Sequence, residues 1–121
     1  MRRVLSAAVT AVSVLALASG CGDDSGDGDS GSETRVVEVS IEGGEVTPAG
    51  TRIDVAVGQP VDFVVTSDVA GELHVHSSPE SYETFEVGSN DPIELQFDRP
   101  GLVDVEMHEP FEGPVVQLQV K

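Results

Sequence analysis

The chain lacks tryptophan, and among its 121 residues it has one tyrosine, one cysteine and only six basic residues. Against these stand 22 acidic residues, which give a formal net charge of −16. Nucleic-acid binding depends on Lys and Arg side chains that neutralise phosphates, so we expect no nucleic-acid partner. A single cysteine also excludes an intrachain disulfide and a cysteine-rich zinc site.

The first twenty residues have the order of parts of a secretory signal peptide. Met1-Arg2-Arg3 is positively charged, residues 4–18 are apolar except for Ser and Thr, and small residues lead up to Cys21. The apolar run is shorter than the roughly 20 residues that a comfortable transmembrane helix needs. We therefore predict a cleaved signal peptide at residues 1–20.

Cys21 stands at the expected cleavage site, and the residues around it resemble the lipobox of bacterial lipoproteins. In that family the cysteine becomes the lipidated N-terminus, and Ala18 here takes the position that usually holds Leu. The resemblance implies a bacterial protein anchored by lipid at Cys21 to the extracytoplasmic face of a cell membrane. The alternative is ordinary secretion with a free thiol at Cys21.

The segment after the cysteine is acidic and contains no apolar side chain between Gly22 and Thr34. Such a segment cannot bury enough surface to fold. We expect residues 21–34 to be a lipidated cysteine and a flexible acidic linker, and residues 35–121 to be one domain. Cleavage would remove Arg2 and Arg3 and leave four basic residues against 22 acidic ones, a formal charge of −18.

From residue 35 onward, apolar residues recur at every second position, which is typical of half-buried β-strands. No stretch shows the 3.6-residue period of a helix over ten or more residues. We expect about eight short strands from nine candidate segments, at residues 37–41, 45–48, 52–57, 61–66, 72–77, 82–87, 93–97, 102–108 and 116–120, the second and sixth being weak. This pattern predicts an all-β, antiparallel Greek-key β-sandwich.

The order of parts from Arg52 onward resembles a cupredoxin. Val57-Gly58-Gln59-Pro60-Val61 leads into an apolar strand, and a loop then leads into the strand that holds His74. A later apolar strand ends in Asp98-Arg99-Pro100-Gly101, and the chain closes with a valine-rich strand. The resemblance covers most of residues 35–121 and implies a cupredoxin-like sandwich, with an immunoglobulin-like sandwich as the alternative.

The copper ligands of that family are mostly missing here. His74 falls where the family has its first His, but the family's Cys falls on Met107 and its second His on Pro110. The axial Met falls near Pro114. A blue-copper site needs a thiolate beside two imidazoles, so the resemblance implies the fold without blue-copper electron transfer. The chain resembles more closely the small cupredoxin-like bacterial lipoproteins that carry a His-x-His strand and a Glu-x-His near the end.

The three histidines all lie in strand-like segments. His74 and His76 are two positions apart on one predicted strand, so both side chains point to the same face, with alpha carbons roughly 6.5 to 7 Å apart. His108 ends another predicted strand, which can lie beside the first in a Greek-key sandwich. Three neutral imidazoles suit zinc or Cu(II), so we predict a metal site at His74, His76 and His108.

Neighbouring carboxylates were candidates for a supporting role at this site. Glu72, Glu106 or Glu109 would be a further ligand or would accept a hydrogen bond that orients an imidazole. Met107 shares a face with apolar residues, so we expect it to pack in the core.

Two other interpretations remain open from the sequence. In one, the histidines are ordinary surface residues of a metal-free structural or protein-interaction module on the cell surface. In the other, Ser77 or Ser78 beside the histidines serves a hydrolase, or Glu106 acts as the base of a zinc enzyme. No nucleophile elbow or other local signature supports an enzyme, so we expect none, and we expect no organic cofactor.

Overall fold

The computed structural model describes residues 33–121, so the predicted signal peptide, Cys21 and nearly all of the linker lie outside the described residues. The described part forms strands only: β1 (Arg35–Glu42), β2 (Glu45–Thr47), β3 (Thr51–Val55), β4 (Pro60–Ser67), β5 (Gly71–Val75), β6 (Ser81–Phe85), β7 (Gly88–Ser89), β8 (Ile93–Gln96), β9 (Gly101–Glu109) and β10 (Gly113–Val120). Within residues 33–121, no helix has the length and apolar character needed to span a membrane.

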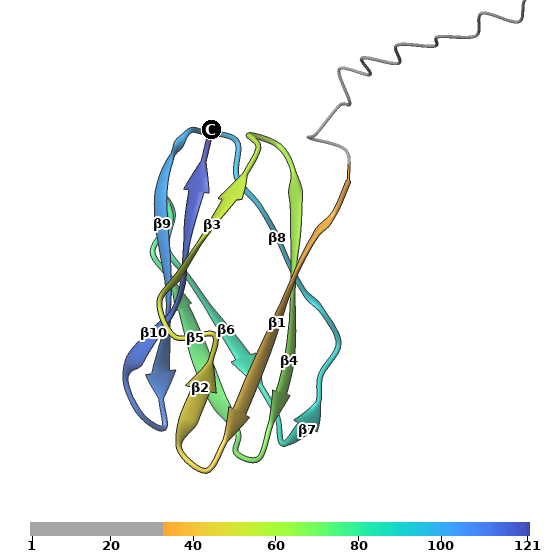
Figure 1. Cartoon of the computed structure of the whole chain (residues 1–121), viewed down its shortest axis with the longest axis vertical. Helices are drawn as coiled ribbons and strands as arrows, with labels where there is room; N and C mark the ends of the chain where they lie inside the picture. The colour runs from red at the N-terminus through yellow and green to blue at the C-terminus, as the bar shows by residue number, and fades with distance from the viewer. Residues whose placement is uncertain (1–32) are drawn as a thin grey trace, which may run out of the picture.

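The strands form two sheets that face each other across one core (Figure 1). In the first sheet, β1 lies between β2 and β4, and the short strands β7 and β8 both pair with the remaining edge of β4. In the second sheet the order is β3-β10-β9-β5-β6. The predicted β-sandwich is therefore confirmed, and β7, where the sequence shows only turn signals, is an additional strand.

Each sheet contains one parallel pair, whereas the sequence led us to expect antiparallel pairing throughout. β1 pairs in parallel with β4, and β3 pairs in parallel with β10. Between β1 and β4 the chain crosses to the second sheet to form β3, so no hairpin dictates their relative direction. Alternation of apolar residues shows which side chains face the core, but it carries no information on the direction of the neighbouring strand.

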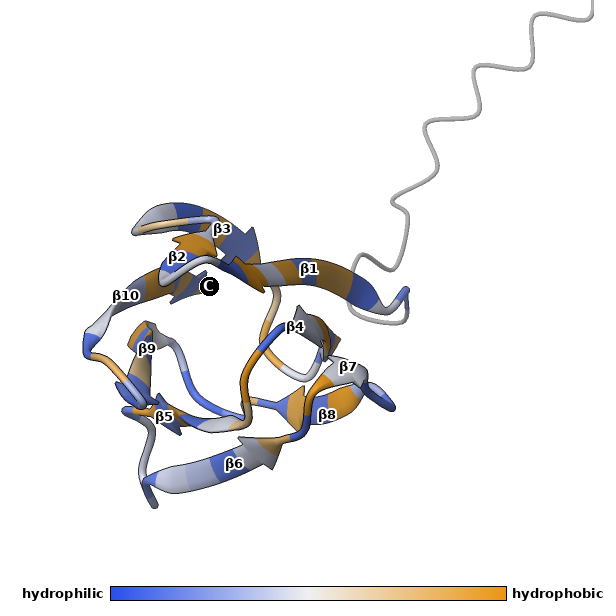
Figure 2. Ribbon diagram, turned by 90° about the horizontal axis from the view of Figure 1, so that it is seen from below, coloured by the Kyte–Doolittle hydropathy of each residue, from blue (hydrophilic) through white to orange (hydrophobic). Residues whose placement is uncertain are grey.

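The core consists of the inward-facing residues of both sheets, most of them valine. Figure 2 shows hydrophobic positions, coloured orange, along strands of both sheets. Phe63 on β4, Leu73 on β5 and Leu118 on β10 are almost fully buried. Together these side chains make one continuous cluster that draws only on residues between β1 and the end of β10. The described part therefore contains a complete core, and no disulfide is needed to hold it together.

The strand β5 positions the histidines because it lies between β9 and the edge strand β6. It pairs with β6 so that His74 lies opposite Tyr82, and with β9 so that His74 lies opposite Glu106. The pairing with β9 shifts register between Glu72 and Leu73, and His108 is the additional residue on β9 at this bulge. A bulge changes the direction of a side chain, so the position of His108 depends on it.

Candidate metal centre

His74 and His76 lie on the outer face of the second sheet. Leu73 and Val75, which alternate with them, are each 1% exposed and belong to the core. The two imidazole rings consequently lie side by side, with ring centroids 3.8 Å apart. This is the arrangement expected of histidines two positions apart on one strand.

His74 is 8% exposed although it points away from the core. The ring of Tyr82 on β6 stacks on the His74 ring, with centroids 4.3 Å apart and planes 8° apart. His76 packs against the His74 ring, and the ring of His108 approaches it edge-on at 5.8 Å. These three rings cover His74 and hold its imidazole in one orientation.

The loop between β5 and β6 brings a carboxylate to the same place. The Ser77 hydroxyl donates a hydrogen bond to the carbonyl oxygen of Pro79, within the turn that leads to Glu80. Oε2 of Glu80 then lies 3.3 Å from Nε2 of His74. His74, His76 and Glu80 each offer a ligand atom, and these atoms lie within 4.8 Å of one another. We call these three residues the His-His-Glu group.

Two further histidine–glutamate pairs flank this group. Oε2 of Glu106 on β9 lies 2.9 Å from Nε2 of His76. Oε1 of Glu72 lies 3.9 Å from Nδ1 of His108, which is too long for a direct hydrogen bond. Glu106 thus lies within hydrogen-bond distance of an imidazole, as an orienting carboxylate would, whereas Glu72 does not reach one. His108, the third predicted ligand, lies beside the His-His-Glu group and is not a member of it.

The donor atoms of the His-His-Glu group fit a divalent ion that accepts nitrogen and oxygen ligands. Zinc binds imidazole nitrogen and carboxylate oxygen tetrahedrally at about 2.0–2.2 Å, so donors on one ion lie roughly 3.3–3.6 Å apart. The donor atoms here lie within 4.8 Å of one another, so the side chains would move closer together on binding the ion. Two imidazoles and a carboxylate leave at least one coordination position open, as in catalytic or exchangeable sites.

The same residues do not fit a blue-copper site. Residues 33–121 contain no cysteine, and Cys21 belongs to the predicted lipid anchor. Met107, at the position of the family's cysteine, is 1% exposed and packs in the core. It lies opposite Leu73 rather than among the imidazoles, as the sequence predicted.

The surface beside the histidines is hollowed. A groove of about 500 Å³, which we call the histidine groove, lies along β9 and β5. It is lined by His74, His76, Glu106, Met107, His108, Glu112, Gly113 and Pro114. The open coordination positions of an ion held by the two imidazoles would therefore be accessible from solvent.

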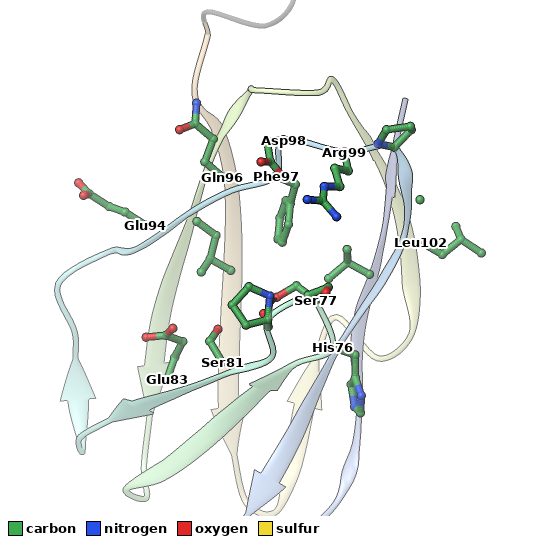
Figure 3. Close-up of a pocket in the computed structure, with 16 residues that line it drawn as sticks. His76, Ser77, Ser81, Glu83, Glu94, Gln96, Phe97, Asp98, Arg99 and Leu102 are labelled. Carbon is green, nitrogen blue, oxygen red and sulfur yellow. Dashed lines mark hydrogen bonds between the residues drawn. The ribbon is translucent and has the colours of Figure 1, made fainter.

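A larger cleft, of about 740 Å³, lies between the β5–β6 loop and the β8–β9 loop. Figure 3 shows Phe97 and Arg99 pointing into it, whereas the His76 ring at its margin points away from the other labelled side chains. Among the described residues this cleft brings no three metal-ligating side chains together. The side chains that could bind a metal thus lie on the outer sheet face and do not converge in this larger cleft.

Comparison with solved structures decides the type of sandwich. A Cu(I) form of an amicyanin variant superimposes on this chain with a TM-score of 0.50 at 15% identity. The match covers 71% of this chain and 82% of the amicyanin chain. A blue copper oxidase from Nitrosomonas europaea gives 0.53 at 14% identity, over 75% of this chain and 44% of its own. The domain has a cupredoxin-like fold. These matches favour the cupredoxin-like sandwich over the immunoglobulin-like alternative.

Another solved structure, a haem–copper terminal oxidase dimer, matches the cupredoxin-like domain at 22% identity and a TM-score of 0.51. The match covers 72% of this chain and 65% of that one, so the chain spans less than two thirds of that relative. No protein-family model matches the sequence. A search of curated proteins finds no relative either. Identities this low establish the fold alone.

Two residues of the candidate centre were missed from the sequence. The sequence pattern assigns no role to Glu80, and it places Tyr82 only at the start of a weak predicted strand. The usable signal was the turn Ser77-Ser78-Pro79, which reverses the chain and returns the next residues toward the strand they left. In this structure the turn brings Glu80 beside the imidazoles and Tyr82 opposite His74.

Proposed function

We propose that this protein is a lipid-anchored, extracytoplasmic metal-binding protein that holds a divalent transition metal through His74, His76 and Glu80. Copper is the leading candidate because solved structures of this fold include copper proteins, and zinc is the second because the same donors suit it. The function would be metal handling without blue-copper electron transfer and without enzymatic activity. The membrane attachment rests on the lipobox-like residues at Cys21.

The observation that carries the proposal is the convergence of three donor atoms within 4.8 Å on one sheet face. Tyr82 adds to it, since a ring stacked at 4.3 Å restricts the orientation of His74 before any ion arrives. A ligand held in place loses less conformational freedom on binding, which favours a specific site over general attraction of cations to an acidic surface.

The experiment is titration of residues 32–121 with Cu(II) and Zn(II), followed by calorimetry and by electron paramagnetic resonance for copper. We expect one ion per chain, with nitrogen hyperfine structure from two imidazoles and a rise in melting temperature. The double variant His74→Ala/His76→Ala should lose stoichiometric binding, and circular dichroism should show an unchanged β-sheet spectrum. Undiminished affinity in this variant would remove the proposal.

One observation favours the alternative of a metal-free interaction module. His74 and His76 each have a glutamate within hydrogen-bond distance, so the Nε2 atom of each ring has a partner without any ion. No buried side-chain nitrogen or oxygen of the described residues lacks a hydrogen-bond partner. Weak binding of several ions per chain, with no gain in melting temperature, would support this alternative.

A further inference from the structure

The histidine groove is surrounded by negative charge. Glu106 and Glu112 line it, Glu72 lies against His108, and Glu80 lies against His74. None of the basic residues of the described part lines the groove. Lys121 is paired with Asp54 at 2.6 Å, and the guanidinium of Arg52 donates to the side chain of Gln117 at 2.8 Å. Within residues 33–121, the ion pairs of Glu72, Glu80 and Glu106 are with histidines, while Arg52 lines a separate pocket that also includes Glu106.

This charge stays negative when the site is loaded. One divalent ion adds two positive charges to four carboxylates and leaves a formal charge of about −2 around the groove. Exposed charges act over roughly 10 Å at 0.1 M salt, so these local carboxylates dominate what an approaching molecule experiences. Both the free and the loaded groove consequently attract cations and repel anions.

The groove also has the features of a contact surface. Tyr82 is 52% exposed beside the buried His74, and tyrosine is enriched where proteins meet. The side chain of His108 is 47% exposed, and that of His76 is 37% exposed. A molecule that reaches the ion from the groove would meet imidazole and carboxylate side chains together, and the exposed Tyr82 lies next to His74 outside the groove lining.

We propose that the histidine groove exchanges its metal with a cationic carrier, meaning a peptide or protein segment that has Lys or Arg next to its own metal ligand. The inference rests on the proposed function. During exchange the ion keeps its charge, a donor of the carrier leaves, and a donor of the His-His-Glu group replaces it. The carboxylates raise the rate of encounter with a cationic carrier and lower it for an anionic one.

The test uses two copper donors that differ mainly in charge. Gly-His-Lys and Gly-His-Glu both bind Cu(II) through the amino terminus, the next amide and the imidazole, so the third residue sets the charge. Each complex is mixed with residues 32–121 in a stopped-flow instrument. Tyr82, the only tyrosine of a chain without tryptophan, reports arrival because bound Cu(II) quenches its fluorescence.

We expect the lysine complex to transfer copper about tenfold faster or more at low salt, with the difference shrinking toward none near 0.5 M salt. The double variant Glu72→Gln/Glu112→Gln should slow the lysine complex about threefold or more at low salt. The matched control Glu38→Gln/Glu42→Gln removes the same charge from β1 in the other sheet and should have a smaller effect.

The possible results separate the two proposals. Equal rates for the two complexes, or equal effects of the two double variants, with stoichiometric copper binding intact, would overturn the cationic-carrier inference alone. If the chain binds copper stoichiometrically neither from the two complexes nor from free Cu(II), both the inference and the proposed function are overturned.

Discussion

The substitution Glu80→Gln separates the His-His-Glu group from the three-histidine site predicted from the sequence. It removes one negative charge and keeps the size of the side chain. The Glu80 side chain is 56% exposed, so the fold should be unaffected. If the carboxylate is a ligand, its loss should weaken binding by at least about 10- to 100-fold, the range typical of residues that only support a ligand. A central value of about 30-fold corresponds to about 2 kcal/mol.

The weaker metal binding can be measured as a smaller metal-dependent rise in the melting temperature. With free metal at about 100 times the dissociation constant, binding to the folded chain alone stabilises it by about 2.7 kcal/mol. For a domain of this size that corresponds to a rise of roughly 11–22 °C. A 30-fold weaker site at the same metal concentration retains about 0.9 kcal/mol, or roughly 4–7 °C. The assay is differential scanning calorimetry of residues 32–121 with and without Cu(II).

His108→Asn is the control, because His108 lies outside the His-His-Glu group. We expect it to retain most of the metal-dependent rise in melting temperature. The reasoning would be refuted if Glu80→Gln retained the full rise and His108→Asn lost it. That pair of results would show that the three histidines bind the ion and that the loop carboxylate does not.

Three further substitutions test the packing around the site. Tyr82→Ala should weaken metal binding up to about tenfold, because stacked rings contribute about 0.5–1.5 kcal/mol, whereas Tyr82→Phe should bind normally in a calorimetric titration. Met107→Leu should leave the dissociation constant unchanged and cost less than about 1.5 kcal/mol in urea unfolding, since the side chain packs in the core. A weaker dissociation constant would instead indicate that its sulfur binds the ion. Gly71→Ala places a Cβ against the backbone oxygen of Glu109 and the ring of Phe85, so unfolding should become easier by about 1–3 kcal/mol. Unchanged stability would contradict this packing.

The fold was largely predictable because its strands are half-buried. One inward-facing residue at every second position marks a strand, and Val37, Val39 and Ile41 on β1 show how regular the pattern is. The parallel pairing of β1 with β4 was not predictable, since it depends on where the chain crosses between sheets. β7 was also missed because two residues are too few to show any period.

Only the part of the site that follows from local strand geometry was predictable from the sequence. Two histidines two positions apart must share a face, and that holds for His74 and His76. The place of Glu80 depends on the conformation of a loop, and that of His108 on a β-bulge, and neither leaves a periodic trace in the sequence. The stacking of Tyr82 depends on the register of an edge strand, which is known only once the hairpin is formed.

Apolar residues and histidines alternate along β5 and the residue that follows it, so one side of the strand packs in the core and the other carries the proposed histidine ligands. Leu73 and Val75 hold the sandwich together, and His74 and His76 contribute nothing to its core. His76, whose side chain is 37% exposed, should accept cysteine, aspartate or alanine with modest cost to folding, whereas a change at the buried His74 also removes its stacking with Tyr82. Among the described residues, the whole proposed ligand set falls within positions 74–80, on one edge hairpin. Grafting this seven-residue segment onto a metal-free sandwich is thus a direct route to an engineered binding protein whose metal preference is chosen by residue type.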